Sequence, residues 1–392
     1  MKIQLVPNEL SAKIKVLGIG GAGGNAINDM ITSQMVGVDF VAANTDAQSL
    51  DKSMAPVKIQ LGPGVTKGLG AGGDPEVGKE ATQEESDRIK QVLQGADMVF
   101  IAAGMGGGTG TGGSPVVAEL SRELGALTVA VVSKPFEFEG KQKKRIAENG
   151  IEELRKVVDT IITIPNDRLF SLSSKNSRIK DVFAMANEVL GYAVRGVSDL
   201  IMVPGFINVD FADVRTVMKE RGMALMGTGI ASGGNRAADA ASKAISSPLL
   251  EDISIRGARG ILINITAAPD ITMEELKEIC GIVQTEAHED AIIKWGLVYD
   301  DGMGEEIRVT VIATGIGKRA PAVEAPVWTA PAAAAMEEDL DIPTILRKEA
   351  DTRRGERPSA MGVAGARKNI VHPDLQYEES ELDVPPFLRK AD

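Results

Sequence analysis

The chain has 392 residues, of which 43 are Lys or Arg and 55 are Asp or Glu, so its formal net charge is −12. This acidic balance argues against a nucleic-acid coat, because binding to a phosphate backbone needs a basic face. A single cysteine excludes an intrachain disulfide, and two histidines argue against a His-based zinc cluster or a Ser-His-Asp triad. No apolar run approaches the ~18–20 residues of a membrane span, and residues 1–10 lack the apolar core of a signal peptide. We therefore expect a cytoplasmic protein with no direct membrane insertion.

Between residue 14 and about residue 165, short β-branched runs alternate with longer amphipathic stretches. Strands are expected at residues 14–19, 39–43, 98–102, 127–132 and 160–164. Helices are expected between them, at residues 25–34, 75–94, 114–123 and 141–158. Repeated strand–helix–strand order implies a parallel sheet covered by helices on both faces. We assign residues 1–178 to this Rossmann-like α/β domain.

A long central helix is expected at residues 179–202. Its apolar residues recur every three or four positions and predict one buried stripe of Val182, Ala186, Val189, Ala193 and Val197.

Residues 203–317 follow as a smaller α+β domain. Within it we expect helices at residues 212–221, 236–246 and 273–280, a further element at residues 260–267, and two β runs. The last β run, residues 307–313, alternates apolar and polar positions and predicts a half-buried antiparallel strand.

The composition changes beyond Gly317. Residues 322–335 are rich in Ala and Pro, and residues 351–381 are polar and nearly free of aromatic side chains. Such a segment buries too little apolar surface to order itself, so a flexible linker is expected over residues 318–382. The last ten residues, 383–392, form a separate peptide.

Glycine is over-represented, with 43 residues or 11% of the chain against an average near 7%. The first cluster, Gly18 to Asn25, follows a strand, precedes a helix and satisfies the spacing G-x-G-x-x-G. Glycines there let backbone N–H groups and a helix N-terminus face a phosphate. Asp46 lies about twenty residues further on, where dinucleotide-binding folds keep an acid for the ribose. NAD binding and a plain tight turn both fit this cluster alone.

The second cluster, Gly104 to Gly113, has seven glycines in ten residues and also joins a strand to a helix. It indicates an anion-binding nest, with Thr109 and Thr111 as further donors, although flexible low-complexity glycine is the alternative. Two such loops at the carboxyl ends of sheet strands suit a nucleotide with several phosphates. No G-x-x-x-x-G-K-[ST] motif occurs, which excludes a P-loop enzyme.

The segment Gly106–Gly112, GGGTGTG, resembles the signature loop of the tubulin/FtsZ superfamily of GTPases. The resemblance covers residues 14–316, includes the segment NVDFADV at residues 208–214, and returns at the C-terminus. It implies GTP as substrate and GDP as product, Mg²⁺, an N-terminal GTPase domain, a long central helix and a smaller C-terminal domain.

The resemblance also implies the residues that contact the nucleotide. Gly21–Asn25 and Gly108–Gly110 would hold phosphates, residues 71–73 would lie near the terminal phosphate, and residues 44–46 near the magnesium side, with Asp46 as a candidate ligand. Glu139 would accept from the ribose, Phe183 would stack on guanine and Asn187 would bond its edge. The full set is Gly20, Gly21, Ala22, Gly23, Gly24, Asn25, Asn44, Ala71, Gly72, Gly73, Gly104, Gly106, Gly107, Gly108, Thr109, Gly110, Glu139, Lys143, Phe183 and Asn187.

Four of these residues have simpler interpretations. Glu139 and Lys143 are spaced i, i+4 and also fit a helix-surface ion pair. Lys143 stands where the superfamily usually has arginine, and lysine lacks the bidentate fork. Without the resemblance, Phe183 would be assigned to the core and Asn187 to a solvated face.

Asn208, Asp210 and Asp213 lie at the start of a predicted helix. From the sequence alone, Asp210 is an N-cap and Asp213 complements the helix dipole. The resemblance implies that this segment enters the nucleotide site of the next subunit, head to tail. Asp210 and Asp213 would there orient and polarise the attacking water, and Asn208 would support them. A head-to-tail contact that does not close generates an open filament.

The C-terminal peptide, residues 383–392, resembles a partner-binding peptide of the superfamily. Residues 341–351 repeat it with seven matches in ten positions when one gap is allowed at Glu349. We expect both copies to bind a membrane-tethering adaptor by a helix-in-groove mode, with avidity, and the C-terminal peptides to bind assembly regulators of the division machinery.

Three classes of function compete. A filament-forming GTPase of the bacterial division ring, at midcell on the inner face of the membrane, uses both glycine clusters, the acidic segment and the tail. An NAD-dependent oxidoreductase uses only the first cluster, and a non-hydrolysing nucleotide-dependent scaffold needs no acidic pair. The sequence favours the GTPase.

Overall fold

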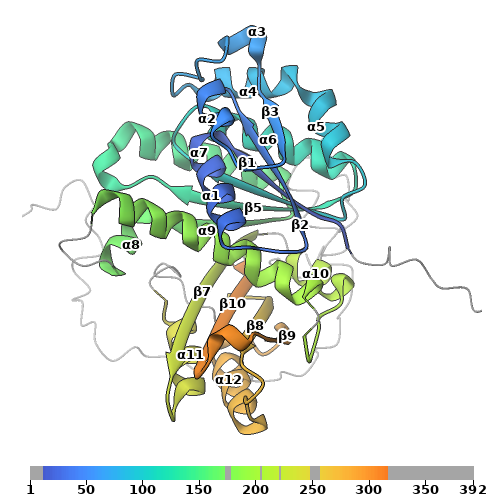
Figure 1. The fold of residues 1–392 in the computed structure, drawn as a ribbon, viewed down its shortest axis with the longest axis vertical. Coiled ribbons are helices and arrows are strands. Elements are labelled where there is room, and N and C mark those ends of the chain that lie inside the picture. Colours follow the sequence, from blue (N-terminus) through green and yellow to red (C-terminus); the bar gives the residue numbers. More distant parts are fainter. Residues whose placement is uncertain (1–11, 173–177, 204, 220–221, 248–256, 317–392) are drawn as a thin grey trace, which may run out of the picture. The chain divides into compact units, whose positions relative to one another are not determined.

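The computed structural model describes residues 12–172, 178–203, 205–219, 222–247 and 257–316 (Figure 1). Backbone contacts divide the chain into two units, Met1–Val323 and Glu324–Asp392, and all described residues lie in the first. The predicted linker, the repeat at residues 341–351 and the peptide at residues 383–392 lie outside the described residues.

The N-terminal part alternates strands and helices, as the pattern predicts. In chain order it contains β1 (Ile14–Ile19), α1 (Gly20–Thr32), β2 (Val38–Asn44), α2 (Ala47–Asp51), β3 (Val57–Gln60), α3 (Pro63–Thr66), α4 (Pro75–Glu84), α5 (Ser86–Leu93), β4 (Met98–Gly104), α6 (Thr109–Glu123), β5 (Leu127–Lys134), the 3₁₀ turn η1 (Glu137–Glu139), α7 (Lys141–Val157), β6 (Thr160–Pro165) and α8 (Asn166–Leu172).

The rest of the described chain contains fewer and longer elements. They are α9 (Ile179–Met202), α10 (Phe211–Met218), β7 (Gly222–Ser232), α11 (Arg236–Ile245), β8 (Gly260–Ala267), α12 (Met273–Glu286), β9 (Ile292–Tyr299), the 3₁₀ turn η4 (Asp301–Met303) and β10 (Glu306–Ile316).

Within the described residues, ten strands form one sheet in the order β3-β2-β1-β4-β5-β6-β7-β10-β8-β9. The strands from β3 to β7 are parallel, whereas β10 pairs antiparallel with β7 and β8. β9 pairs parallel with β8 and ends the sheet. The predicted α/β class, with a smaller α+β part after the central helix, is confirmed.

Helices cover both faces of the parallel strands because successive side chains of a strand point to opposite faces. On β1, Val16 belongs to the core shared with α1 and α9, whereas Leu17 belongs to the core shared with α5, α6 and α7. A third core lies between β7–β10 and the helices α11 and α12.

The central helix α9 has the predicted bounds, and all five residues of its predicted stripe are buried. Its apolar side chains share one core with β1, β4 and β5 and also with β8 and β10. In Figure 1 this green helix lies between the parallel strands and the strands β7–β10. It therefore joins the parallel-sheet part to the segment that carries the acidic residues.

Two helices begin earlier than predicted. α1 starts at Gly20 rather than Asn25, and α6 at Thr109 rather than Ser114. Glycine weakens a helix by about 1 kcal/mol per residue relative to alanine, so both glycine clusters were interpreted as loops. Tight packing accounts for the difference, since a methyl group on Gly23 would overlap the carbonyl oxygen of Ala102 in β4.

The predicted helix at residues 75–94 is two helices, because Glu85 leaves the helical conformation between α4 and α5 (φ −100°, ψ 16°). The Ser86 hydroxyl donates to the Gln83 carbonyl there (2.7 Å), a bond that competes with the helix.

The interpretation of residues 307–313 as half-buried is wrong, although their antiparallel pairing is confirmed. Thr310 and Ile312 are 4% and 1% exposed, because α9 covers one face of β10 and α11 covers the other. The glycine-rich strand β7 was not predicted. Methyl groups on Gly227 and Gly229 would overlap the carbonyl oxygens of Ala244 and Ala240 in α11, so this strand needs glycine for packing.

Candidate functional site

A cavity of about 260 Å³ lies at the carboxyl ends of β1, β4 and β5, where ligands bind in open α/β sheets. It brings together thirteen of the predicted nucleotide-binding residues: Gly20, Gly21, Ala22, Gly104, Gly106, Gly107, Gly108, Thr109, Gly110, Glu139, Lys143, Phe183 and Asn187. Residues from the two glycine clusters, η1, α7 and α9 thus face one space, although up to 167 positions separate them in sequence.

Two helix N-termini open into this cavity. Neither α1 nor α6 has a side-chain cap at its N-cap residue, Ile19 and Gly108 respectively. The first backbone N–H groups of a helix need partners, and they carry a partial positive charge. An anion in the cavity would satisfy both requirements, so the arrangement suits phosphate groups.

The glycines of this site have two different roles. A methyl group on Gly21 or Gly107 would meet no protein atom within 4 Å, so these positions leave the backbone open to a ligand. By contrast, a methyl on Gly112 would overlap the carbonyl oxygen of Pro75, and one on Gly110 would lie 2.6 Å from the carbonyl oxygen of Gly104. The second cluster is therefore packed between α4 and β4, and the flexible-glycine alternative is wrong.

An ion pair forms part of the cavity lining. The Lys143 ammonium lies 3.1 Å from Glu139 Oε2, so the predicted i, i+4 ion pair is present. Glu139 Oε1 also accepts from the backbone N–H of Phe136 at 3.0 Å. Because both side chains line the cavity, the surface-pair interpretation and the binding interpretation are compatible.

An aromatic side chain also lines the cavity. Phe183 is 41% exposed and contacts Phe136 edge to face, with ring centroids 5.1 Å apart. Phe136 stacks in turn on Phe138. Phe183 is thus a surface residue held by an aromatic neighbour, and its assignment to the core is wrong. Asn187 is half-buried, and its Nδ2 donates to Asp29 Oδ2 at 3.0 Å, so it is not simply solvated.

Sequence reasoning missed several lining residues, namely Ile19, Met105, Ser133, Pro135, Asn166 and Ala186. Asn166 is the informative one, because it is 5% exposed and its Oδ1 has no hydrogen-bond partner among the described residues. A buried amide oxygen without a partner is costly, and a ligand in the cavity would supply one. Its position directly after β6, at the carboxyl end of a parallel strand, is the signal that could have identified it.

Seven predicted binding residues do not line the cavity: Gly23, Gly24, Asn25, Asn44, Ala71, Gly72 and Gly73. Ala71 is buried, and its Cβ would lie 2.7 Å from a methyl on Gly108, so residues 71–73 border the second glycine cluster. Gly72 and Gly73 have φ angles of +59° and +81°, which glycine adopts without strain.

Residues 44–46 also border the cavity. The Thr45 and Thr109 hydroxyl groups form a buried hydrogen bond of 2.6 Å, which ties this segment to the start of α6. Asp46 caps α2 by accepting from the N–H groups of Gln48 and Ser49. The Ser49 hydroxyl group donates to Asp46 as well, and this bond holds the pKa of that carboxyl below its ordinary value.

None of the acidic-segment residues lines this cavity. Asn208 Oδ1 accepts from the Gly205 N–H at 2.8 Å. Asp210 occupies the N-cap position of α10, but its carboxylate makes no capping bond, so the side-chain cap expected from the sequence is absent from the described contacts. Asp213 lies in the first turn and pairs with Lys294 (Nζ–Oδ1 3.0 Å), a partner that the sequence did not indicate.

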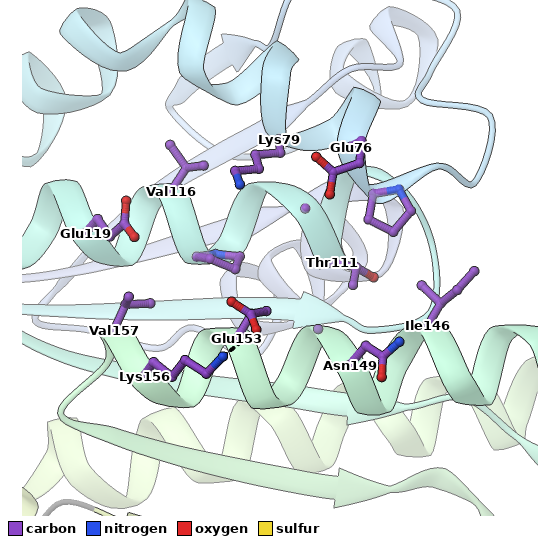
Figure 2. A pocket seen from close by; sticks show the side chains of 14 residues that line it. Glu76, Lys79, Thr111, Val116, Glu119, Ile146, Asn149, Glu153, Lys156 and Val157 are labelled. Atoms are coloured by element: carbon purple, nitrogen blue, oxygen red, sulfur yellow. Dashed lines mark hydrogen bonds and ion pairs between the residues drawn. The ribbon is translucent and has the colours of Figure 1, made fainter.

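A second hollow of about 470 Å³ lies between α4, α6 and α7 (Figure 2). Three carboxylates line it, from Glu76, Glu119 and Glu153, together with the ammonium groups of Lys79 and Lys156, and much of its remaining lining is aliphatic. Its ionised groups therefore sum to one negative charge, which disfavours phosphates, so the smaller glycine-lined cavity, into which two helix N-termini open, is the better nucleotide site.

Comparison with known proteins agrees with this geometry. Residues 13–174 match the sequence model of the Tubulin/FtsZ family, GTPase domain, and residues 222–317 match that of the FtsZ family, C-terminal domain. The chain is 50% identical to the cell division protein FtsZ of Pseudomonas aeruginosa and 49% identical to that of Coxiella burnetii, with 97% of each chain covered in both cases. A solved FtsZ dimer of M. jannaschii has a TM-score of 0.76 and 45% identity, over 80% of this chain and 90% of that one. This chain therefore belongs to the tubulin/FtsZ family, with the family's GTPase domain before the central helix and an FtsZ C-terminal domain after it.

Proposed function

We propose that this chain is a bacterial cell-division GTPase in which GTP bound by one subunit is hydrolysed when the acidic loop of the next subunit completes the site. Membership of the family gives GTP hydrolysis and GTP/GDP binding. The shared site is supported by one observation. Glu139 is the only carboxylate that lines the described cavity, and both its oxygens are already bonded, so a water-orienting acid has to come from elsewhere.

Asp210 and Asp213 are the acids proposed for this role. Phosphoryl transfer depends mainly on positioning and on neutralising charge, and an orienting residue places the attacking water in line. In our proposal the amides at the starts of α1 and α6 hold the phosphates. Asp213 and Asp210 of the neighbouring subunit orient the water. Asn208, which accepts a hydrogen bond from the Gly205 N–H, stabilises the conformation of their loop.

The remaining lining residues would bind the nucleoside. Phe183 offers an exposed ring face, Asn187 and Asn166 offer amides, and Glu139 offers a carboxylate to the ribose. Lys143, held against Glu139, would supply a positive charge near the phosphates.

Mg²⁺ belongs to this proposal as a metal that arrives with the nucleotide. Across the part of the chain that the structure describes, no three His, Cys, Asp or Glu side chains gather closely enough to hold a metal ion. This fits Mg²⁺, which in nucleotide sites keeps waters and takes many of its ligands from phosphates. In our proposal Asp46, whose two oxygens already accept hydrogen bonds, would hold one of the ion's waters, and the bound ion would neutralise phosphate charge.

Exposed apolar side chains near the cavity and beside the acidic loop support head-to-tail assembly. Leu69, in the segment before Ala71, and Phe138, beside Glu139, are large apolar side chains exposed near the cavity. Phe206 is exposed beside the acidic loop and packs on Tyr299. Apolar side chains at both ends would be buried together if the loop of one subunit met the cavity of the next.

The tail completes the proposal. None of the helices in the described ranges is long and apolar enough to span a membrane. We propose that the peptides at residues 341–351 and 383–392 bind adaptors that recruit the filament to a midcell ring, because two similar sites in one chain give avidity.

Complementation tests the shared site. Asp213→Ala removes the acid and leaves the cavity, whereas Gly107→Val fills the cavity and leaves the acid. Each variant alone should release phosphate slowly, and a mixture should recover part of the activity because some interfaces pair an intact cavity with an intact loop. Turnover that is lost in Gly107→Val but unchanged in Asp213→Ala would contradict the proposal.

A further inference from the structure

The segment that carries the acidic residues is fastened to the edge strand β9. Ile207 and Leu297 form an antiparallel bridge, with backbone hydrogen bonds of 3.3 and 2.9 Å in the two directions. Gly296 permits this approach, because a methyl group there would lie 3.0 Å from the Ile207 carbonyl oxygen and 3.3 Å from Val209. The acidic segment and β9 therefore behave as one surface.

Lys294 lies on this surface, because it stands two residues before Gly296 and its side chain therefore leaves β9 on the face where Gly296 meets the acidic segment. From there its ammonium reaches the first turn of α10 and contacts Asp213 Oδ1 at 3.0 Å. The two side chains are 36% and 41% exposed, so the pair sits at the surface that a neighbouring subunit would meet.

Within the described ranges, one oxygen of Asp213 is engaged. Among the described residues, the structure records no partner for Oδ2, and no other side chain forms an ion pair with Asp213. A lysine on an edge strand often serves to discourage strand pairing. Here the edge is already covered at Leu297 by the bridge to Ile207, and the ammonium is directed at a carboxylate rather than at open solvent.

We propose that Lys294 is a positioning residue for Asp213 in the hydrolysis of GTP bound by the neighbouring subunit. The ammonium holds Oδ1 and leaves Oδ2 to face the attacking water. It also lowers the charge of the loop from two negative charges to one as the loop approaches the phosphates, which reduces repulsion. This inference rests on the proposed role of Asp213.

Two substitutions of Lys294 separate the effect of its charge from the effect of its side-chain length. Lys294→Met keeps a chain of similar length without the charge, and Lys294→Arg keeps the charge. Lys277→Met, on the exposed face of α12, makes the same change in net charge away from the loop. All three should unfold in urea at nearly the wild-type midpoint, because exposed ion pairs contribute little to stability.

The readouts are phosphate release per polymerised subunit at saturating GTP, the critical concentration for assembly, and GTP affinity of the unassembled protein. Lys294→Met should lower turnover about two- to five-fold, as loss of one exposed ion pair would, and raise the critical concentration. Its GTP affinity should be unchanged, because Lys294 does not line its own subunit's cavity. Lys294→Arg should restore most of the turnover, and Lys277→Met should match the wild type.

A double variant that combines Asp213→Asn with Lys294→Met shows whether Lys294 acts through Asp213. In Asp213→Asn, the further change Lys294→Met should have no additional effect on turnover. An equal loss in both backgrounds would mean that Lys294 acts independently, which overturns the inference. Wild-type turnover and assembly in Lys294→Met, with Asp213→Ala inactive, would also overturn it and leave the proposed function intact. Full turnover in Asp213→Ala would instead refute the proposed function.

Discussion

The glycines of the candidate nucleotide site offer a direct test. The structure divides them into glycines whose backbone is open to a ligand and glycines whose backbone packs closely against a helix. Gly107 and Gly112 lie five positions apart and represent the two roles. We consider the substitution of each by alanine, which adds one methyl group.

Gly112→Ala should destabilise the fold. Its methyl group would overlap the Pro75 carbonyl oxygen and lie 2.7 Å from the Lys79 backbone nitrogen. Backbone atoms cannot rotate away, so α4 would have to move from α6. Overpacking of this kind costs about 1–3 kcal/mol, offset by about 1 kcal/mol of helix propensity. Since two backbone groups are overlapped, we expect the upper end of the cost and a net loss of about 2 kcal/mol.

Gly107→Ala should fold normally and bind GTP weakly. Its methyl would meet no protein atom, and Gly107 is not among the residues with positive φ, so we expect stability within about 0.5 kcal/mol of wild type. The methyl would project into the cavity. If the backbone approaches a phosphate there, the overlap should cost about 1–3 kcal/mol, or roughly ten- to hundred-fold in Kd.

Urea unfolding without nucleotide and equilibrium binding of a fluorescent GTP analogue measure the two effects separately. Gly281 is the matched control, since it lies inside α12 with no neighbouring atom within 4 Å. Gly281→Ala should gain up to about 1 kcal/mol and bind GTP normally. Wild-type affinity in Gly107→Ala would refute the close approach of the backbone, and wild-type stability in Gly112→Ala would refute the packing argument.

Four further changes have expected outcomes. Burial raises the pKa of Asp199 from 3.8 to about 6, so the folded state binds this proton more tightly and the free energy of unfolding falls as pH rises from about 4 to about 6. Asp199→Asn should therefore be more stable at pH 7, by at most about 3 kcal/mol, with the difference vanishing below pH ~4 in thermal melts. Asn166→Ala should weaken GTP binding in titrations without loss of stability, because its unpartnered oxygen contributes nothing to the fold. Lys143→Arg should tighten GTP binding several-fold, since arginine contacts phosphates bidentately. Deleting residues 341–351 should weaken adaptor binding, measured by co-sedimentation with polymers, and equal binding would remove the case for a second copy.

The features that sequence predicted best depend on local repetition. The bounds of β1 and α9 follow from runs of β-branched residues and from a regular apolar spacing, and the structure reproduces both. Predictions from local patterns were wrong where a residue is required for packing against an element that is distant in sequence. Glycine normally weakens helices and strands, yet Gly23 lies in the first turn of α1 and Gly227 lies in a strand, because β4 and α11 pack too closely for a side chain.

The same division holds for the site. The spacing within the glycine clusters is local, so it predicts a phosphate site. The place of Asn166 in the cavity and the contacts of Phe183 depend instead on how elements distant in sequence pack together. The pairing of Asp213 with Lys294 joins residues 81 positions apart, and it exists because β9 lies at the sheet edge beside the acidic loop. No spacing rule links them.

In our proposal the site is divided between two subunits, which also explains why the sequence patterns at each half look unremarkable. The cavity holds amides, one lysine and one carboxylate that is already bonded, which suffices to bind a nucleotide but not to orient a water. The loop and the adjoining strand β9 together hold two carboxylates and a lysine, which resemble an ordinary helix start with a surface ion pair. Hydrolysis needs both sets within a few ångströms, so in our proposal its rate reports assembly. A GTPase built this way stays slow as a monomer without any inhibitory element, because the missing acid belongs to the next subunit.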